Sequence, residues 1–147
     1  MNNYKTWYYI HGVLPWTKNC YFGKFSPQIS ISLHHDNYTK PLYPYGYILE
    51  ILKTKIIRAF DCDVTSETDS IGNKSFSRLT CLNSFRNYHY SELNTLIRNT
   101  KMGSHNEIWI QSEHVEIVGI YINKEVPGVN SFKKAARKNN IIVPQFS

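Results

Sequence analysis

Three short segments of the chain combine a chemically capable side chain with a strand-like neighbourhood. His11-Gly12 ends the aromatic run WYYI, Ser30-Ile31-Ser32 lies in the alternating segment QISISL, and Asn106-Glu107 opens the apolar run EIWI. A carboxylate can stabilise the positive charge that develops on a ribose when its glycosidic bond breaks. A histidine can hold ribose or phosphate oxygens, and a serine at a strand end can brace the carboxylate. These residue types suit cleavage of a ribosyl bond.

Aromatic side chains provide a further ingredient, because a planar leaving group can be held between rings. The chain contains 11 tyrosines, and Tyr38 and Tyr43 lie in a stretch punctuated by prolines. We expect one of these two to stack on a ligand. Tyr47 lies further along, inside an apolar run, and is expected to pack in the core.

The elements that must position these residues are mostly strands. Aromatic, β-branched or alternating runs predict strands, and they cover residues 4–10, 28–33, 45–57, 107–110 and 115–122, with a last strand over 141–146. The run 45–57 is expected to form a central strand. Residues 61–75 are polar and rich in Ser, Thr and Asp, which predicts a surface loop.

Two segments predict helices. In residues 90–100, Leu93, Leu96 and Ile97 recur at helical spacing and Ser91 is expected to cap the N-terminus. Residues 132–138, FKKAARK, form a short basic helix candidate. Many strands with one or two helices indicate an α+β fold with a mixed or antiparallel β-core. A chain of 147 residues suits one domain, over residues 1–147.

The charge balance bears on partners. The formal net charge is +6, which favours a polyanion such as nucleic acid, an acidic protein or an anionic membrane; a solvated surface without any partner is the alternative. Adjacent strand residues point to opposite faces, so His34-His35-Asp36 does not predict a metal site, and none is expected.

The cysteines and the absence of targeting segments indicate a compartment. Cys20, Cys62 and Cys81 have no C-x-x-C spacing, and we expect free thiols in a reducing compartment. No run of about eighteen apolar residues predicts a membrane span, and the N-terminus lacks the pattern of a signal peptide. The expected location is the cytoplasm, or a host cytoplasm reached without a cleaved signal peptide.

Over residues 4 to 123 the order of these motifs resembles the cholera/pertussis-toxin superfamily of ADP-ribosyltransferases. His11 stands at the first-motif position that holds a basic residue, and Ser30-Ile31-Ser32 matches a Ser-Thr-Ser strand. GYILEI, residues 46–51, is similar to an aromatic core strand, and Glu107 opens a strand that IVGIYI follows. The resemblance implies a split β-core with few short helices.

The resemblance also implies roles. Glu107 would be the catalytic carboxylate of a mono-ADP-ribosyltransferase toxin or effector that cleaves NAD and modifies a macromolecule. NAD, as substrate, would be bound by His11, Gly12, Ser30, Ser32, Tyr38 and Tyr43. The acceptor would be a protein or, as in the similar DNA-modifying toxins of toxin–antitoxin systems, a nucleic acid. An antitoxin or inhibitor would be a further partner.

The chain departs from the family pattern two residues before Glu107. Many members carry Glu or Gln there, whereas this chain has His105, which we assign to acceptor positioning and which argues against arginine as acceptor. A rival register uses Gln111-Ser112-Glu113, a literal Q-x-E. We prefer Glu107, because Glu113 leaves too few residues before the strand that begins near Ile117.

Two other classes of function remain open. Six histidines, many tyrosines and a basic charge would suit a nucleic-acid-binding module or a metal-independent ribonuclease that uses histidine as acid and base. An inactive relative of the transferase fold that only inhibits a partner is the third possibility.

Overall fold

The structure is a computed structural model that describes residues 7–13, 21–23, 25–35, 39–79, 86–101 and 105–141, with the backbone alone for 65–68 and 75–79. Its strands are β1 (Trp7–Gly12), β2 (Gln28–His35), β3 (Tyr45–Ile51), β4 (Arg58–Phe60), β5 (Val64–Thr68), β6 (Lys74–Leu79), β7 (Glu107–Gln111) and β8 (Val115–Ile122). The helices are α1 (Leu93–Asn99) and α2 (Val129–Lys138), and single 3-10 turns cover Lys53–Lys55, Tyr90–Glu92 and Ser112–His114.

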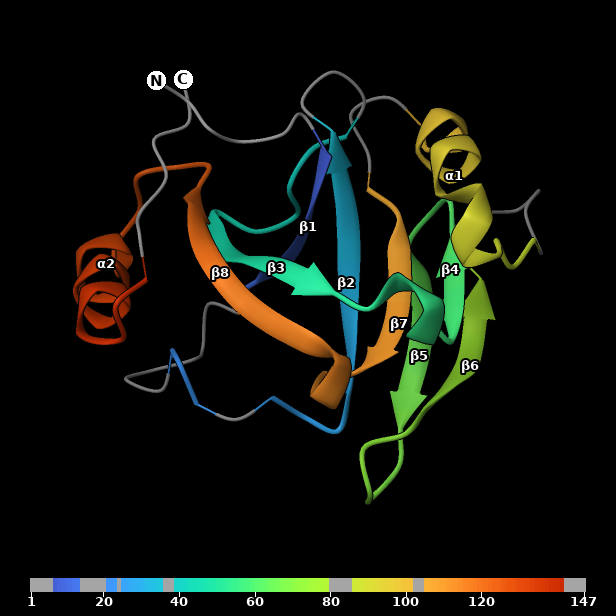
Figure 1. Cartoon of the computed structure of the whole chain (residues 1–147), viewed down its shortest axis with the longest axis horizontal. Coiled ribbons are helices and arrows are strands. Elements are labelled where there is room, and N and C mark those ends of the chain that lie inside the picture. The colour runs from blue at the N-terminus through green and yellow to red at the C-terminus, as the bar shows by residue number, and fades with distance from the viewer. Residues whose placement is uncertain are drawn as a thin grey trace.

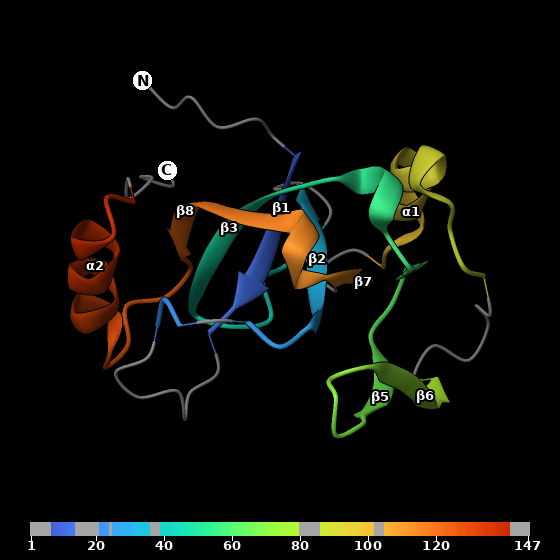
Figure 2. The same cartoon turned by 60° about the horizontal axis from the view of Figure 1, so that its bottom comes forward.

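Six of the strands form one sheet, in the order β4-β7-β2-β1-β3-β8 (Figure 1). Every neighbouring pair in this sheet is antiparallel. Strands β5 and β6 form a separate hairpin that stands off from the sheet (Figure 2). The predicted α+β class with an antiparallel core is therefore confirmed.

The middle of the sheet separates along part of its length. Strands β1 and β2 pair from Trp7–His35 to Ile10–Ser32. Beyond that point β1 continues against β3 as far as Gly12, whereas the start of β2 pairs with β7. The two halves of the sheet part there, and the His11 side chain spans the gap, with Nδ1 2.6 Å from the Ser30 carbonyl oxygen.

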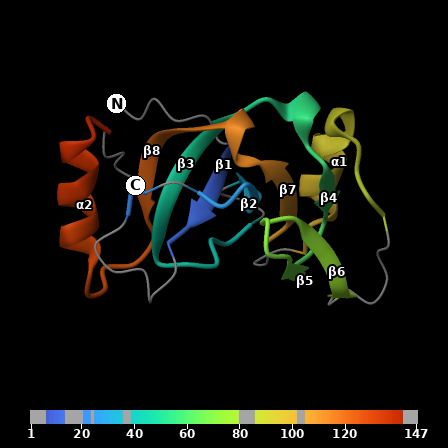
Figure 3. The same cartoon turned by 90° about the horizontal axis from the view of Figure 1, so that it is seen from below.

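The main core lies against one face of the sheet. Because side chains alternate along a strand, Ile29, Ile31 and Leu33 of β2 face this core and Ser30 and Ser32 face the other way. Both helices contribute to the same core, and the strands lie between them (Figure 3). The helical side chains in this core are Leu93, Leu96 and Ile97 of α1 and Val129, Phe132 and Ala136 of α2. The opposite face is left for the polar residues of the site.

Two facing glycines allow rings to lie directly on that opposite face. Gly12 and Gly46 are partners in β1 and β3. A Cβ on Gly12 would lie 2.1 Å from Cδ2 of Tyr43, and a Cβ on Gly46 would lie 2.4 Å from the His11 carbonyl oxygen and 2.6 Å from Cε1 of Tyr121. Any side chain at these positions would therefore push Tyr43 or Tyr121 away from the strands.

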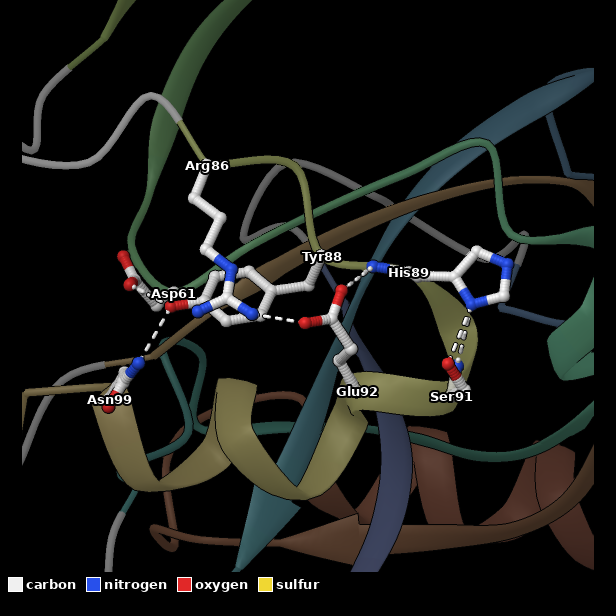
Figure 4. A network of polar contacts seen from close by, with 7 residues as sticks. All are labelled: Asp61, Arg86, Tyr88, His89, Ser91, Glu92 and Asn99. Atoms are coloured by element: carbon white, nitrogen blue, oxygen red, sulfur yellow. Dashed lines mark hydrogen bonds and ion pairs between the residues drawn. The ribbon is translucent and has the colours of Figure 1, made fainter.

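A polar network fixes the segment before α1 to the end of β4 (Figure 4). The Tyr88 hydroxyl donates to Asp61 Oδ2 at 2.6 Å, and Asn99 donates to that hydroxyl at 2.9 Å. The Arg86 guanidinium lies over the Tyr88 ring and pairs with Glu92. The network matters for the site because it holds Asp61, two residues before a cavity residue described below.

Several boundaries differ from the sequence-based expectations. The strand predicted over 45–57 ends at Ile51, where a 3-10 turn begins at Lys53. The predicted loop 61–75 contains β5 and the start of β6, joined by a turn in which Asp69 accepts from two backbone amides and Gly72 has φ +92°. The helix of residues 132–138 starts earlier, at Val129. The strand expected over 141–146 falls outside the described residues after its first position.

The predicted cap of the 90–100 helix is wrong. His89, not Ser91, is the capping residue: its ring nitrogen accepts from the Ser91 amide, and Glu92 reaches back to the His89 amide. Ser91 instead places its hydroxyl 2.7 Å from the same His89 nitrogen. The helix thus begins one 3-10 turn before α1 proper.

The expectation of free thiols is also wrong, because Cys62 forms a disulfide. Its partner lies outside the described residues. An odd number of cysteines does not prevent one pair from forming. The prediction of a reducing compartment depended on free thiols, and the disulfide removes that support.

No helix in the described part of the chain combines the length and apolar character that a membrane crossing needs.

Candidate functional site

A cavity of about 320 Å³ lies on the polar face of the sheet, where β1 and β2 part. It is lined by residues from five strands and the segments around them: Ile10, His11, Gly12, Ser30, Ile31, Ser32, Leu42, Tyr43, Asp63, Lys74, His105, Asn106, Glu107 and Tyr121. We call it the site cavity. Its lining mixes apolar walls with a few charged groups, as expected of a small-molecule site.

Glu107 is the buried carboxylate of the site cavity. It is the first residue of β7 and is 8% exposed. Trp109, two residues later on the same face of the strand, donates its indole N–H to Oε2 of Glu107 at 2.5 Å. Trp109 is itself buried and packs edge-on against Phe60 of β4. The carboxylate is therefore held in one orientation by a ring that cannot move freely.

Asn106 fixes where β7 begins. Its amide pairs with the backbone of Leu33 as a strand residue would: Oδ1 accepts from the Leu33 N–H at 2.8 Å and Nδ2 donates to the Leu33 carbonyl at 2.8 Å. Ser32 donates its hydroxyl to the Asn106 carbonyl at 2.6 Å. Asn106 is fully buried. This double pairing, which we call the Asn106 clamp, places Glu107 opposite β2.

A second carboxylate, Asp63, faces Glu107 from the segment between β4 and β5. Its side chain is hydrogen-bonded to Glu107. Oδ1 of Asp63 also lies 3.5 Å from Nε2 of His105. The hydrogen bond with His105 makes the largest contribution to lowering the pKa of Asp63, and it keeps that carboxyl ionised. Asp63 thus contacts both Glu107 and His105.

Burial raises the pKa of Glu107 to about 7. The hydrogen bond and negative charge of Asp63 act in the same direction, while the Trp109 N–H and the positive charge of Lys74 oppose it. Two carboxyls that share a hydrogen bond need one proton between them, and Glu107 is the one that carries it at low pH. Above pH 7 the cavity gains a second negative charge.

His11 supplies a neutral imidazole to the cavity. Burial lowers its pKa, and the charge of Lys74 adds to that effect, while the Ser30 carbonyl opposes it. Because a carbonyl oxygen can only accept, Nδ1 carries the proton that is donated to Ser30. The ring also packs against Phe25 and Tyr47, so His11 joins β1 to β2 at the edge of the cavity.

Tyr43 and Tyr121 form the aromatic part of the cavity. Tyr43 lies over Gly12, and the Tyr121 hydroxyl is 3.4 Å from the Tyr43 carbonyl oxygen. Both rings come from the β3–β8 side of the cavity, whereas Glu107 comes from the β7 side. A flat ligand group between these sides would contact an aromatic ring and a carboxylate together.

The structure brings together the site residues expected from the sequence, with one exception. His11, Gly12, Ser30, Ser32, Tyr43, His105 and Glu107 all line the site cavity. Tyr38 lies outside the described residues. Glu113, the carboxylate of the rival register, is 70% exposed in the 3-10 turn after β7, pairs with His114, and does not line the cavity. The geometry therefore favours Glu107 over Glu113.

Two charged residues of the cavity were missed in the sequence, Asp63 and Lys74. Both fall in the stretch 61–75 that was predicted to be a surface loop: Asp63 immediately precedes β5, and Lys74 is the first residue of β6. The signal was the turn sequence from Asp69 to Gly72, which follows the β-branched residues Val64, Thr65 and Thr68 and contains the aspartate and glycine typical of a turn. No group of three or more His, Cys, Asp or Glu within the described ranges is arranged to hold a metal ion.

We predict that Asn106→Ala destabilises the fold by about 2–4 kcal/mol, because it leaves the buried N–H and carbonyl of Leu33 unpaired. Urea unfolding measures the loss. The control is Asn139→Ala, which removes an exposed amide from the end of α2 and should cost below about 1 kcal/mol. Equal losses in the two variants would contradict the importance of the Asn106 clamp.

We predict that Glu107→Gln stabilises the folded protein. The folded-state pKa of Glu107 lies above its ordinary value of 4.5, so ionisation opposes folding increasingly as the pH rises from 4.5 towards 7. A glutamine can keep the contacts to Trp109 and Asp63 without the charge. The expected gain in unfolding free energy is about 2 kcal/mol at pH ~8 and below about 1 kcal/mol at pH ~5. A loss of stability at the higher pH would refute the assignment of an unfavourable buried charge.

Comparison with known proteins gives no independent indication of the function of the site. No family model matches the sequence, and neither a curated protein nor a solved structure matches the chain. The assignment of function therefore depends on the residues of the site cavity and their geometry.

Proposed function

We propose that the protein is an NAD-dependent mono-ADP-ribosyltransferase whose catalytic carboxylate is Glu107. One observation carries the proposal: residues from four separate parts of the chain, chosen for this chemistry from the sequence, line one cavity. The meeting of these residues does not follow from closeness in the sequence. His11 and Glu107 are far apart in the chain, and their strands, β1 and β7, are separated by β2 in the sheet.

Glu107 stabilises the ribosyl cation. When the bond between nicotinamide and ribose breaks, positive charge develops at C1′ and its ring oxygen. A carboxylate buried beside that centre, held in orientation by Trp109, meets the charge without reorganisation. The same carboxylate can accept a hydrogen bond from the ribose 2′-hydroxyl.

The other cavity residues hold NAD in place. His11 fixes the gap between β1 and β2 through its contact with the Ser30 carbonyl, and so shapes the wall against which the ribose lies. Tyr43 stacks on the nicotinamide ring, and Lys74 attracts the diphosphate. The cavity is at the lower end of the sizes of ligand pockets. It accommodates the nicotinamide riboside half of NAD, and the adenosine half extends out of it.

The proposal also covers the acceptor, the location and a protein partner. The acceptor is a macromolecule, protein or nucleic acid, and the net charge of +6 suits an anionic one. The protein acts as a toxin or effector in its own or a host cytoplasm, where an antitoxin or inhibitor controls it.

A ribonuclease is the second candidate, because His11 and His105 both line the site cavity. Two histidines can act as acid and base on a phosphodiester. We favour the transferase, since in a ribonuclease the neighbouring carboxyl groups of Asp63 and Glu107 would repel the phosphate.

We predict that the protein releases nicotinamide from NAD and that Glu107→Gln lowers this rate by about 10²–10³-fold, because the charge on the ribosyl cation is then unopposed. Nicotinamide is quantified by chromatography. The matched control is Glu113→Gln, which changes an exposed carboxylate six residues away and should leave the rate unchanged. A rate lost in Glu113→Gln and kept in Glu107→Gln would reverse the register. RNA cleavage that requires His11, without NAD turnover, would favour the ribonuclease.

We also predict a pH dependence. Since Glu107 must be ionised to oppose positive charge and its pKa is raised to about 7, kcat/KM for nicotinamide release should rise with pH and be half-maximal near pH 7. Below that pH the protonated carboxyl is inactive. Initial rates from acidic to alkaline buffers give the profile. A rate that falls as the pH rises through 7 would mean that Glu107 acts as an acid instead.

A further inference from the structure

A second cavity of about 340 Å³ adjoins the site cavity. Three residues, Leu42, Tyr43 and His105, line both cavities. The remaining lining residues come from the segment before β3 and the residues after β8: Lys40, Pro41, Pro44, Asn123 and Lys124. We call this the side cavity. It contains two lysines and no carboxylate among its lining residues.

His105 stands in the wall shared by the two cavities. Its side chain is 16% exposed, and its Nε2 faces Asp63 at 3.5 Å. Within the described part of the chain, the other ring nitrogen, Nδ1, makes no hydrogen bond. An imidazole with one nitrogen oriented by a carboxylate and the other open is the arrangement of a general base. The open nitrogen can therefore serve a group that enters through the side cavity.

We propose that the side cavity admits the ADP-ribose acceptor and that His105, oriented by Asp63, removes the acceptor's proton. The inference depends on the proposed function. It names the acceptor as a neutral O–H or N–H nucleophile on a molecule that carries negative charge nearby, because Lys40 and Lys124 line its route. His105 is a catalytic residue in this scheme, and Asp63 is a positioning residue.

The reaction balances without any further reagent. The bond between C1′ of the ribose and the nicotinamide nitrogen breaks, and its electron pair leaves with neutral nicotinamide. The acceptor heteroatom forms a new bond to C1′, and its proton passes to Nδ1 of His105. The Asp63 carboxylate then stabilises the imidazolium. Glu107 opposes the charge on the ribose and takes no part in the proton transfer.

Asp63 suits the positioning role because it stays ionised. Its contact with His105 keeps the pKa of Asp63 low, so a charged partner is present when the imidazole gains a proton. Asp61, two residues earlier, is held by the Tyr88 hydroxyl, and Cys62 is held by its disulfide. The segment that carries Asp63 is therefore anchored at both preceding positions.

Azide tests the base directly, because it is an anionic nucleophile with no proton to lose. With NAD and water alone, we expect His105→Gln to hydrolyse NAD about 100-fold more slowly than the unaltered protein. Added azide should restore nicotinamide release and give ADP-ribosyl azide, which mass spectrometry identifies. Asp63→Asn should show a smaller loss with the same rescue.

Two controls separate this role from a structural one. Glu107→Gln should stay inactive with azide, because bond cleavage itself fails there. Asp63→Asn should also move the midpoint of the pH profile below that of the unaltered protein, since removal of the neighbouring negative charge lowers the pKa of Glu107. Thermal unfolding of each variant confirms that it is folded.

The possible results divide cleanly. If His105→Gln hydrolyses NAD normally, or if azide fails to rescue a folded His105→Gln, the base assignment is wrong while the NAD-cleaving function stands. If the unaltered protein releases no nicotinamide from NAD, the proposed function fails and this inference fails with it.

Discussion

The Asn106 clamp is the interaction on which the rest of the site depends. One amide side chain satisfies both backbone groups of Leu33, at a point where β2 has no strand residue of β7 opposite it. Leaving both backbone groups unsatisfied would cost about 1–3 kcal/mol for each group. The clamp therefore does two tasks: it completes the sheet, and it sets the residue that follows, Glu107, at the mouth of the gap between β1 and β2.

The site is held at the expense of local stability. A carboxyl with a pKa of about 7 is one that folding has forced into an unfavourable environment. Around it the fold is well satisfied: no buried side-chain nitrogen or oxygen in the described residues lacks a hydrogen-bond partner. A buried carboxyl group with a raised pKa, in a cavity whose surroundings are fully paired, is typical of a functional position. Burial of the ionised carboxylate destabilises the fold at neutral pH. The same burial strengthens the attraction between that carboxylate and a positive charge beside it.

The sequence predicted the strands with alternating or apolar runs well, because their periodicity records which face is buried. It also predicted that His11, Ser30 and Glu107 would meet, although only by resemblance and not by any local pattern. It failed at two pieces of local turn chemistry and at one long-range contact. The His89 cap depends on a side chain one turn before the helix, and the β5–β6 hairpin depends on a turn hidden in polar sequence. The role of Asp63 was missed because it depends on a long-range contact with His105, which is 42 positions away in the chain.

The β5–β6 hairpin has a consequence of its own. Two of the charged residues that line the cavity belong to it or adjoin it, since Lys74 begins β6 and Asp63 directly precedes β5, yet the hairpin is not part of the six-stranded sheet. It meets β2 through the Lys74 amide, 3.3 Å from Gln28 Oε1, and packs Gly72 near Pro27. A two-stranded hairpin has little stability alone, so these few contacts hold it in register. The framework that carries Glu107 and the module that tunes its charge are thus separable, and sequence drift in one can retune the other without rebuilding the fold.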